Sequence, residues 1–167
     1  MEHAVDRGGF DGRDALWALL SVLAVNAVGA APALLAGPDT AWFAALEKPA
    51  IYPPGWAFGV VWTLLFTLMG LALYLVARRG LSTPGVRTAL ALFVVQMAVN
   101  VTWTPTFFAA QDLLAGLAVI VVLDVLVAAT ILAFDRVDRR AALLLVPYLA
   151  WVLFATLLNY RFFALNG

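Results

Sequence analysis

The 167-residue chain contains no cysteine, and its one histidine is His3, near the start of the sequence. Without cysteine, the protein has no disulfide, no thiolate nucleophile and no cysteine-ligated metal. A single histidine in a polar tail also argues against a haem ligand or a histidine proton relay. We therefore expect no metal site and no resident cofactor.

Charged side chains are scarce as well. They make up 12% of the chain, against about 25% in a typical soluble domain. Hydrophobic residues account for 65% of the chain, and the mean hydropathy is +0.98. The formal net charge is zero, which gives no support for binding to nucleic acid. This composition is typical of an integral membrane protein that lies mostly in the lipid bilayer.

Five apolar runs are long enough to cross a membrane, since a helical span needs about 20 such residues. They cover residues 15–36, 55–77, 86–108, 113–134 and 141–163. A polar tail of residues 1–14 precedes them, and a short tail of residues 164–167 follows. The sequence thus predicts one all-α domain, a five-helix transmembrane bundle at residues 15–163, in a multi-pass membrane protein.

Basic residues are distributed unevenly between the two sides of this bundle. The side that holds the N-terminus carries Arg7, Arg13, Arg78, Arg79, Arg87, Arg136, Arg139 and Arg140, whereas the other side carries Lys48 and Arg161. Cytoplasmic loops of membrane proteins are enriched in arginine and lysine. We therefore predict a cytoplasmic N-terminus, which puts the first loop outside.

The first loop, residues 37–54, is the longest break between spans. Asp39 or Thr40 can cap a short helix that ends before the loop prolines, and Trp42 and Phe43 make this helix amphipathic. Prolines stiffen the remainder of the loop. Two interpretations stay open: a structured cover over the outer end of the bundle, or an interfacial anchor, because tryptophan and tyrosine favour the membrane boundary.

One face of the third span combines amides with aromatic rings. The residues spaced i, i+4, i+7 and i+11 are Gln96, Asn100, Trp103 and Phe107, and this spacing places them on one side of a helix. An unpaired amide in hydrocarbon costs several kcal/mol. This face must therefore point toward protein, water or a ligand.

The fifth span repeats the pattern with Tyr148, Trp151, Ala155 and Asn159. The small Ala155 leaves space between the third and fifth spans. With the first loop as a cover, the two spans would enclose a mostly apolar, aromatic cavity that opens toward the outer leaflet. Aromatic stripes at helical spacing are also typical of ordinary core packing, and that alternative stays open.

Asp124 stands alone near the middle of the fourth span. A carboxyl group at that depth is costly and marks a functional site by default. The alternative is a neutral hydrogen bond to a neighbouring helix. No lysine, arginine or histidine lies in the middle of any span, so no ion-pair relay can be assembled, which argues against a proton-coupled transporter.

Three motifs, in order along the chain, resemble the TspO/MBR family of translocator proteins, also called tryptophan-rich sensory proteins or peripheral benzodiazepine receptors. They are WFAALEKPAIYPPGW at 42–56, QMAVNVTWTPTFF at 96–108 and VPYLAWVLFATLLNY at 146–160. The resemblance implies a five-helix bundle that binds tetrapyrroles such as protoporphyrin IX and, in animal members, cholesterol and synthetic drug ligands. It also implies a pocket between the helices beneath the first loop.

By this resemblance the pocket includes Trp42 and Phe43 from the loop, Asn100 and Trp103 from the third span, and Trp151 and Ala155 from the fifth. Together with the motif and face residues, the candidate ligand-binding set also includes Ile51, Gln96, Phe107 and Tyr148. Some bacterial members are reported to degrade protoporphyrin in light, which makes Trp151 the candidate catalytic residue. Members commonly form homodimers, and the GxxxG pattern of Gly55 and Gly59 is a candidate contact.

The sequence departs from the family pattern in three places. Many members carry a tryptophan where this chain has Ile51, so one aromatic wall and one proposed photochemical tryptophan are missing. The fourth-helix acid of some members corresponds to Val119 rather than to Asp124. The cholesterol pattern fails because Arg161 follows Tyr160 directly and no later lysine or arginine exists, so we do not predict sterol binding.

Three functions remain open at this stage. The first is a membrane receptor or sensor-carrier for tetrapyrroles or similar planar apolar ligands, with Asn100 or Gln96 donating to the ligand, and with a role in tetrapyrrole metabolism or stress regulation. The second is a light-dependent porphyrin-degrading enzyme, although no acid–base pair, nucleophile or metal cluster supports ordinary catalysis. The third is a small-solute transporter, indicated only by Asp124. The expected partners are an apolar small molecule, the bilayer and a second copy.

Overall fold

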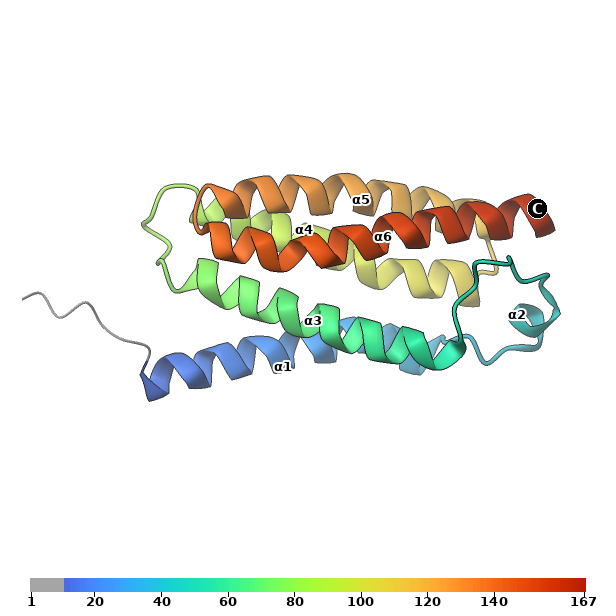
Figure 1. Ribbon diagram of the computed structural model, residues 1–167, viewed down its shortest axis with the longest axis horizontal. Coiled ribbons are helices and arrows are strands. Elements are labelled where there is room, and N and C mark those ends of the chain that lie inside the picture. The colour runs from blue at the N-terminus through green and yellow to red at the C-terminus, as the bar shows by residue number, and fades with distance from the viewer. Residues whose placement is uncertain (1–10) are drawn as a thin grey trace, which may run out of the picture.

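The computed structural model describes residues 11–167, so the predicted tail residues 1–10, with His3 and Arg7, lie outside it. The described chain forms one helical bundle (Figure 1). Its long helices are α1 (Gly12–Leu35), α3 (Gly55–Ala77), α4 (Val86–Thr104), α5 (Leu113–Asp135) and α6 (Arg139–Asn166). Two short elements are α2 (Ala41–Ala45) in the first loop and η1 (Pro105–Ala109), a π-helical turn that continues α4.

The predicted fold class, a five-helix membrane bundle, is confirmed. Within residues 11–167, five helices are long and apolar enough to cross a membrane, with α4 and η1 acting as one span. The fifth span is longer than residues 141–163, because α6 begins at Arg139 and ends at Asn166.

The helices form two groups that meet along α3 and α6. Helix α5 packs against α4 and α6, while α1 packs mainly on α3 (Figure 1). The bundle has two distinct ends. The loop end holds α2, η1 and the end of α6, and the arginine end holds the start of α1 and the α3–α4 and α5–α6 connections.

Acidic side chains cap several helix starts by accepting backbone N–H bonds, which satisfies donors that the helix itself leaves free. Asp112 accepts from the N–H of Ala115 at 2.8 Å and starts α5. Asp11 and Asp14 form a reciprocal capping box, so α1 begins at Gly12 and residues 12–14 of the predicted polar tail are helical.

Glycines allow α1 and α3 to approach closely. A Cβ added to Gly70 would lie 2.5 Å from the Cα of Val22, and one added to Gly29 would lie 2.3 Å from the ring of Phe66. Both distances are well inside van der Waals contact. Side chains at these two positions would push the helices apart.

Apart from this crossing, α1 contributes little to the core. Its only buried side chains are Ala18 and Val25. Polar contacts add to the α1–α3 interface: the Asn26 amide donates to the Thr67 hydroxyl at 3.3 Å, and the Tyr74 hydroxyl donates to the Asp14 carboxylate. The core of the molecule is therefore built mainly by α3, α4, α5 and α6.

An ionic cluster joins α3 to α6 at the arginine end. The Asp138 carboxylate is 5% exposed and accepts from Arg79 Nη2 at 2.6 Å and from Arg140 Nε at 3.4 Å. Burial alone would raise the pKa of Asp138, but the hydrogen bonds from Arg79 and Arg140 outweigh it and hold that pKa below its usual value.

Candidate ligand-binding site

A cavity of about 170 Å³ lies at the loop end of the bundle. Its walls come from the end of α1, the first loop, α3, α4 with η1, and α6. The lining residues are Ala33, Pro38, Phe43, Tyr52, Gly55, Phe58, Trp62, Trp103, Thr104, Phe107, Phe108, Leu158, Asn159 and Phe162. A mostly apolar, aromatic wall with a few polar groups is typical of small-molecule sites.

Stacked and edge-on aromatic rings form one wall of this cavity. Trp103 stacks on Phe107 with centroids 5.1 Å apart and an interplanar angle of 27°. Phe43 from the first loop meets Phe108 edge-on at 5.1 Å. Such pairs contribute about 0.5–1.5 kcal/mol each beyond the burial of their area, so the wall is fixed before any ligand arrives.

The π-helical turn η1 brings two consecutive rings into this wall. Ala110 N–H donates to Pro105 O at 2.9 Å, an i→i+5 bond, and Pro105 itself has no N–H to continue the α-helical pattern. The wider turn lets Phe107 and Phe108 contact each other and both pack against Phe43. The sequence predicts a regular helix to Phe108, and Pro105 is the one residue in it that indicates a change of helix type.

Asn159 fixes the orientation of the central indole. Trp103 Nε1 donates to Asn159 Oδ1 at 3.2 Å, and Asn159 Nδ2 donates to the carbonyl of Ala155 at 2.8 Å. Asn159 lies on the predicted inward face of the fifth span but is not among the predicted ligand-binding residues. An amide in an otherwise apolar span was the signal that could have included it.

The first loop covers the cavity, as the first of the two predicted alternatives states. Thr40, rather than Asp39, caps α2, since its hydroxyl accepts from Phe43 N–H at 3.1 Å. The resulting short helix holds Phe43, which is buried and lines the cavity. The loop and the bundle therefore share one aromatic cluster.

Two further contacts attach the loop to the end of α6. The main chain of Glu47 donates to Asn166 Oδ1 at 2.8 Å and accepts from Asn166 Nδ2 at 3.1 Å; we call this the Glu47–Asn166 pair. The Lys48 ammonium lies 3.9 Å above the Phe43 ring and donates to the carbonyls of Phe43 and Leu46. Burial lowers the pKa of Lys48.

Three of the predicted site residues, Gln96, Asn100 and Tyr148, form a separate network in the middle of the bundle. Asn100 Nδ2 donates to the Tyr148 hydroxyl at 2.8 Å, and that hydroxyl donates to Gln96 Oε1 at 3.0 Å. All three side chains are buried, and none lines the cavity. Asn100 thus spends a donor on Tyr148, whereas Gln96 is bonded only through its carbonyl oxygen, and its Nε2 is buried with no hydrogen-bond partner among residues 11–167.

The other predicted residues differ in their relation to the cavity. Trp42 packs edge-on against Phe107 at 5.8 Å, and Trp151 meets a cavity-lining phenylalanine of α3 at 6.0 Å. Ala155 is half-buried and contributes its carbonyl to Asn159, whereas Ile51 is 41% exposed. From the predicted set, the residues that line the cavity directly are Phe43, Trp103 and Phe107.

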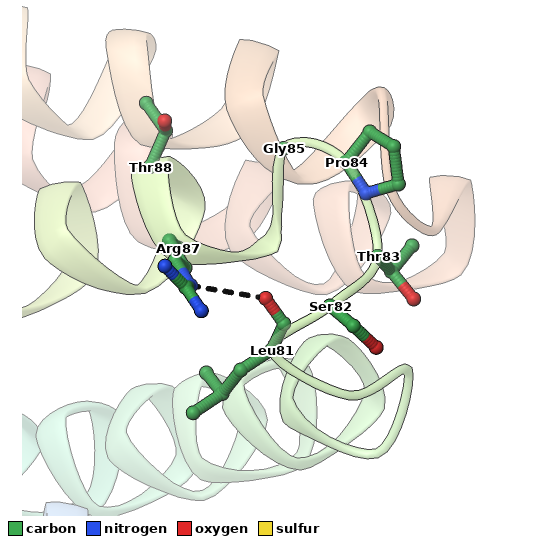
Figure 2. Close-up of a pocket in the computed structure, with 7 residues that line it drawn as sticks. All are labelled: Leu81, Ser82, Thr83, Pro84, Gly85, Arg87 and Thr88. Atoms are coloured by element: carbon green, nitrogen blue, oxygen red, sulfur yellow. Dashed lines mark hydrogen bonds between the residues drawn. The ribbon is translucent and has the colours of Figure 1, made fainter.

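A second hollow lies at the arginine end, in the connection between α3 and α4. Figure 2 shows its lining residues, Leu81, Ser82, Thr83, Pro84, Gly85, Arg87 and Thr88. Arg87 Nε donates to the Leu81 carbonyl at 3.1 Å and so stabilises the loop (Figure 2). No aromatic ring lines this hollow, which makes it unsuited to a planar apolar ligand.

Within residues 11–167, no cluster of histidine, aspartate or glutamate could hold a metal ion.

The fold and the cavity define a class: a multi-pass helical membrane protein with an aromatic cavity beneath a structured first loop. The model of the TspO/MBR family matches residues 21–165, which covers part or all of every helix of the bundle and leaves out the first turns of α1. The chain belongs to the TspO/MBR family.

Several characterised proteins are similar over most of this chain. The tryptophan-rich protein TspO of Chlorobaculum tepidum is 43% identical over 141 residues, 84% of this chain and 89% of that protein. The tryptophan-rich sensory protein of Cereibacter sphaeroides is 42% identical over 151 residues, 90% and 92% of the two chains. The human translocator protein is 40% identical over 125 residues, 74% of each chain.

Proposed function

We propose that this membrane protein is a receptor or sensor-carrier for planar apolar ligands of the tetrapyrrole class, with a role in tetrapyrrole metabolism or stress regulation. The observation that carries the proposal is the stacked Trp103–Phe107 pair, held by Asn159, in a cavity beneath the first loop. A flat ring system entering the cavity would exchange contact with lipid or water for contact with aromatic faces. Tyr52, Thr104 and Asn159 are the lining residues with polar side chains that could orient it.

The size of the cavity implies that the first loop moves on binding. Its volume of about 170 Å³ is below the roughly 300–1,000 Å³ of most ligand pockets. A tetrapyrrole macrocycle therefore does not fit into the cavity in its present shape. The Glu47–Asn166 pair consists of two exposed hydrogen bonds, each with a net value of about 1 kcal/mol. Opening this pair and displacing Phe43 would enlarge the cavity at a cost that ligand burial can offset.

The orientation belongs to the proposal as well. Arginines 78, 79, 87, 136, 139 and 140 gather at the end of the bundle opposite the cavity. By the positive-inside rule, we place the N-terminus in the cytoplasm and the cavity toward the outer leaflet. A second copy remains a predicted partner; Gly55 and Gly59 support it, since a Cβ added at either would meet nothing within 4 Å.

The decisive experiment is a titration of the detergent-purified protein with protoporphyrin IX in the dark, in which binding is monitored by the porphyrin absorption band. We expect saturable binding that Trp103→Ala weakens about tenfold, because lost stacking and burial amount to about 1–2 kcal/mol. The matched control is Trp56→Ala, since Trp56 lies at the same end but is 73% exposed. Equal affinities in the wild type and Trp103→Ala would exclude this cavity as the site.

Illumination of the same complex separates the receptor from the alternative, a light-dependent porphyrin-degrading enzyme. Trp151 lies against Phe58, which lines the cavity, so it is the residue through which such chemistry would pass. Under the receptor proposal, porphyrin loss in light equals that with denatured protein. Faster loss that Trp151→Phe abolishes would favour the enzyme.

A further inference from the structure

Asp124 is the central residue of α5, and its carboxyl group faces α6. Its Oδ2 lies 2.8 Å from the hydroxyl oxygen of Thr156. Its Oδ1 is buried and has no hydrogen-bond partner within residues 11–167. Neither residue lines the aromatic cavity, so this contact lies outside the proposed ligand site.

The Thr156 hydroxyl has two hydrogen-bond contacts but only one proton to donate. The Thr156 hydroxyl oxygen lies 2.8 Å from Asp124 Oδ2 and 3.0 Å from the carbonyl oxygen of Val152. A hydroxyl has one proton to donate, and an ionised carboxylate and a carbonyl can only accept. Both contacts can be hydrogen bonds only if Asp124 carries a proton and donates it to Thr156, which then donates to Val152.

Among the residues that the structure describes, the elements packed against Asp124 place no compensating cation beside it. Helices α4 and α6 and the turn η1 pack against α5. In α4 the one charged residue is Arg87, at the arginine end, and η1 has no titratable group. The charged residues of α6 lie near its two ends, at Arg139, Arg140 and Arg161.

The remaining titratable groups of α6 are phenols. Tyr148 is buried within the network of Gln96 and Asn100, and Tyr160 lies toward the loop end and is exposed. An ionised Asp124 would therefore be a membrane-buried anion with a single hydrogen bond, which is far costlier than a neutral acid with one unpaired oxygen.

We propose that Asp124 is a proton-binding site of the folded protein, which retains its proton at neutral pH and donates it to Thr156 across the contact between α5 and α6. The bound proton joins the two helices at mid-membrane depth. Thr156 precedes Asn159 by three residues on α6, so loss of this proton would disturb a segment that also forms the cavity wall.

Infrared spectroscopy of the purified full-length chain tests the proposal directly. With the aspartate side-chain carboxyls labelled with ¹³C, we expect a C=O stretch of a protonated carboxylic acid at neutral pH. This band should be absent from Asp124→Asn and unchanged in the control Asp39→Asn, because Asp39 is exposed in the first loop. A labelled protein that shows only carboxylate bands, or an acid band that persists in Asp124→Asn, would overturn the proposal.

A second variant tests the hydrogen bond and needs no change at Asp124. Thr156→Val keeps the shape of the side chain but removes the acceptor, so the acid band should move to higher frequency. An acid band that stays at its wild-type frequency would contradict donation to Thr156. These spectra require no ligand, so their outcome is separate from that of the porphyrin titration.

Discussion

At the scale of single residues, Trp103 illustrates what helical spacing predicts and what it does not. Its helical spacing from Gln96, Asn100 and Phe107 predicted an inward face, and the structure buries those three side chains. The pattern did not predict that Asn100 bonds to Tyr148 while Asn159 bonds to Trp103. Partners on another helix depend on the relative rotation and height of both helices, which periodicity within one helix does not contain.

The Asn159–Trp103 bond supplies a prediction at this scale. In Asn159→Ala the indole N–H loses its acceptor, so we expect a loss of about 1–3 kcal/mol in the free energy of unfolding and weaker porphyrin binding. Thermal unfolding in detergent and the absorption titration measure the two effects. The control is Asn26→Ala, which removes an amide from the α1–α3 interface and should leave porphyrin affinity unchanged. Wild-type porphyrin affinity in Asn159→Ala would show that binding does not depend on the hydrogen bond between Trp103 and Asn159.

At the scale of elements, the long helices follow from hydropathy, while the details that shape the site do not. The π turn depends on an i→i+5 bond, and a proline near the end of a span is compatible with several turn types. Helix α1 begins three residues before the predicted span, because a reciprocal cap between two aspartates makes a helix out of residues that composition alone assigns to a polar tail.

The close crossing of α1 and α3 gives a prediction for these elements. Gly70→Ala places a Cβ about 2.5 Å from the α1 backbone, so α1 must shift, and we expect destabilisation of about 1–3 kcal/mol. Gly12→Ala in α1 is the glycine-to-alanine control, since its Cβ meets no atom within 4 Å and Gly12 lies outside the GxxxG pattern. Unfolding by sodium dodecyl sulfate in mixed micelles compares the two. Equal stabilities would mean that α1 moves away without cost.

At the scale of the whole molecule, the two ends of the bundle are held by different forces. Aromatic packing and neutral hydrogen bonds hold the loop end, whereas the buried Asp138 and its arginines hold the arginine end. The sequence predicted the membrane bundle correctly, because hydropathy is a sum over many residues. It could not predict which of several arginines near Asp138 would pair with it, since that depends on how α3 and α6 meet.

The Asp138 cluster predicts an acid-sensitive stability. Its pKa is held below the usual aspartate value, so in that range the unfolded chain binds more protons than the folded one. The contribution of Asp138 is therefore complete at neutral pH and is lost as the pH falls through its folded pKa. Asp138→Asn should flatten this part of the stability profile, measured by thermal unfolding against pH, and Asp39→Asn should retain it. An unchanged profile in Asp138→Asn would rule out this cluster as the cause.

The weak engagement of α1 has a consequence for how the protein can change over evolutionary time. Its first turns hold a single buried side chain, Ala18, whereas Asn26 and Gly29 meet α3 directly. The family match begins only at residue 21, inside this helix. Packing constrains the second half of α1. In the first half, Asp14 bonds to Tyr74 and the backbone of Val22 lies against Gly70, but the other positions are free to drift as long as they stay apolar. We expect lineages of this protein to diverge first in that segment, while the aromatic end retains its side chains.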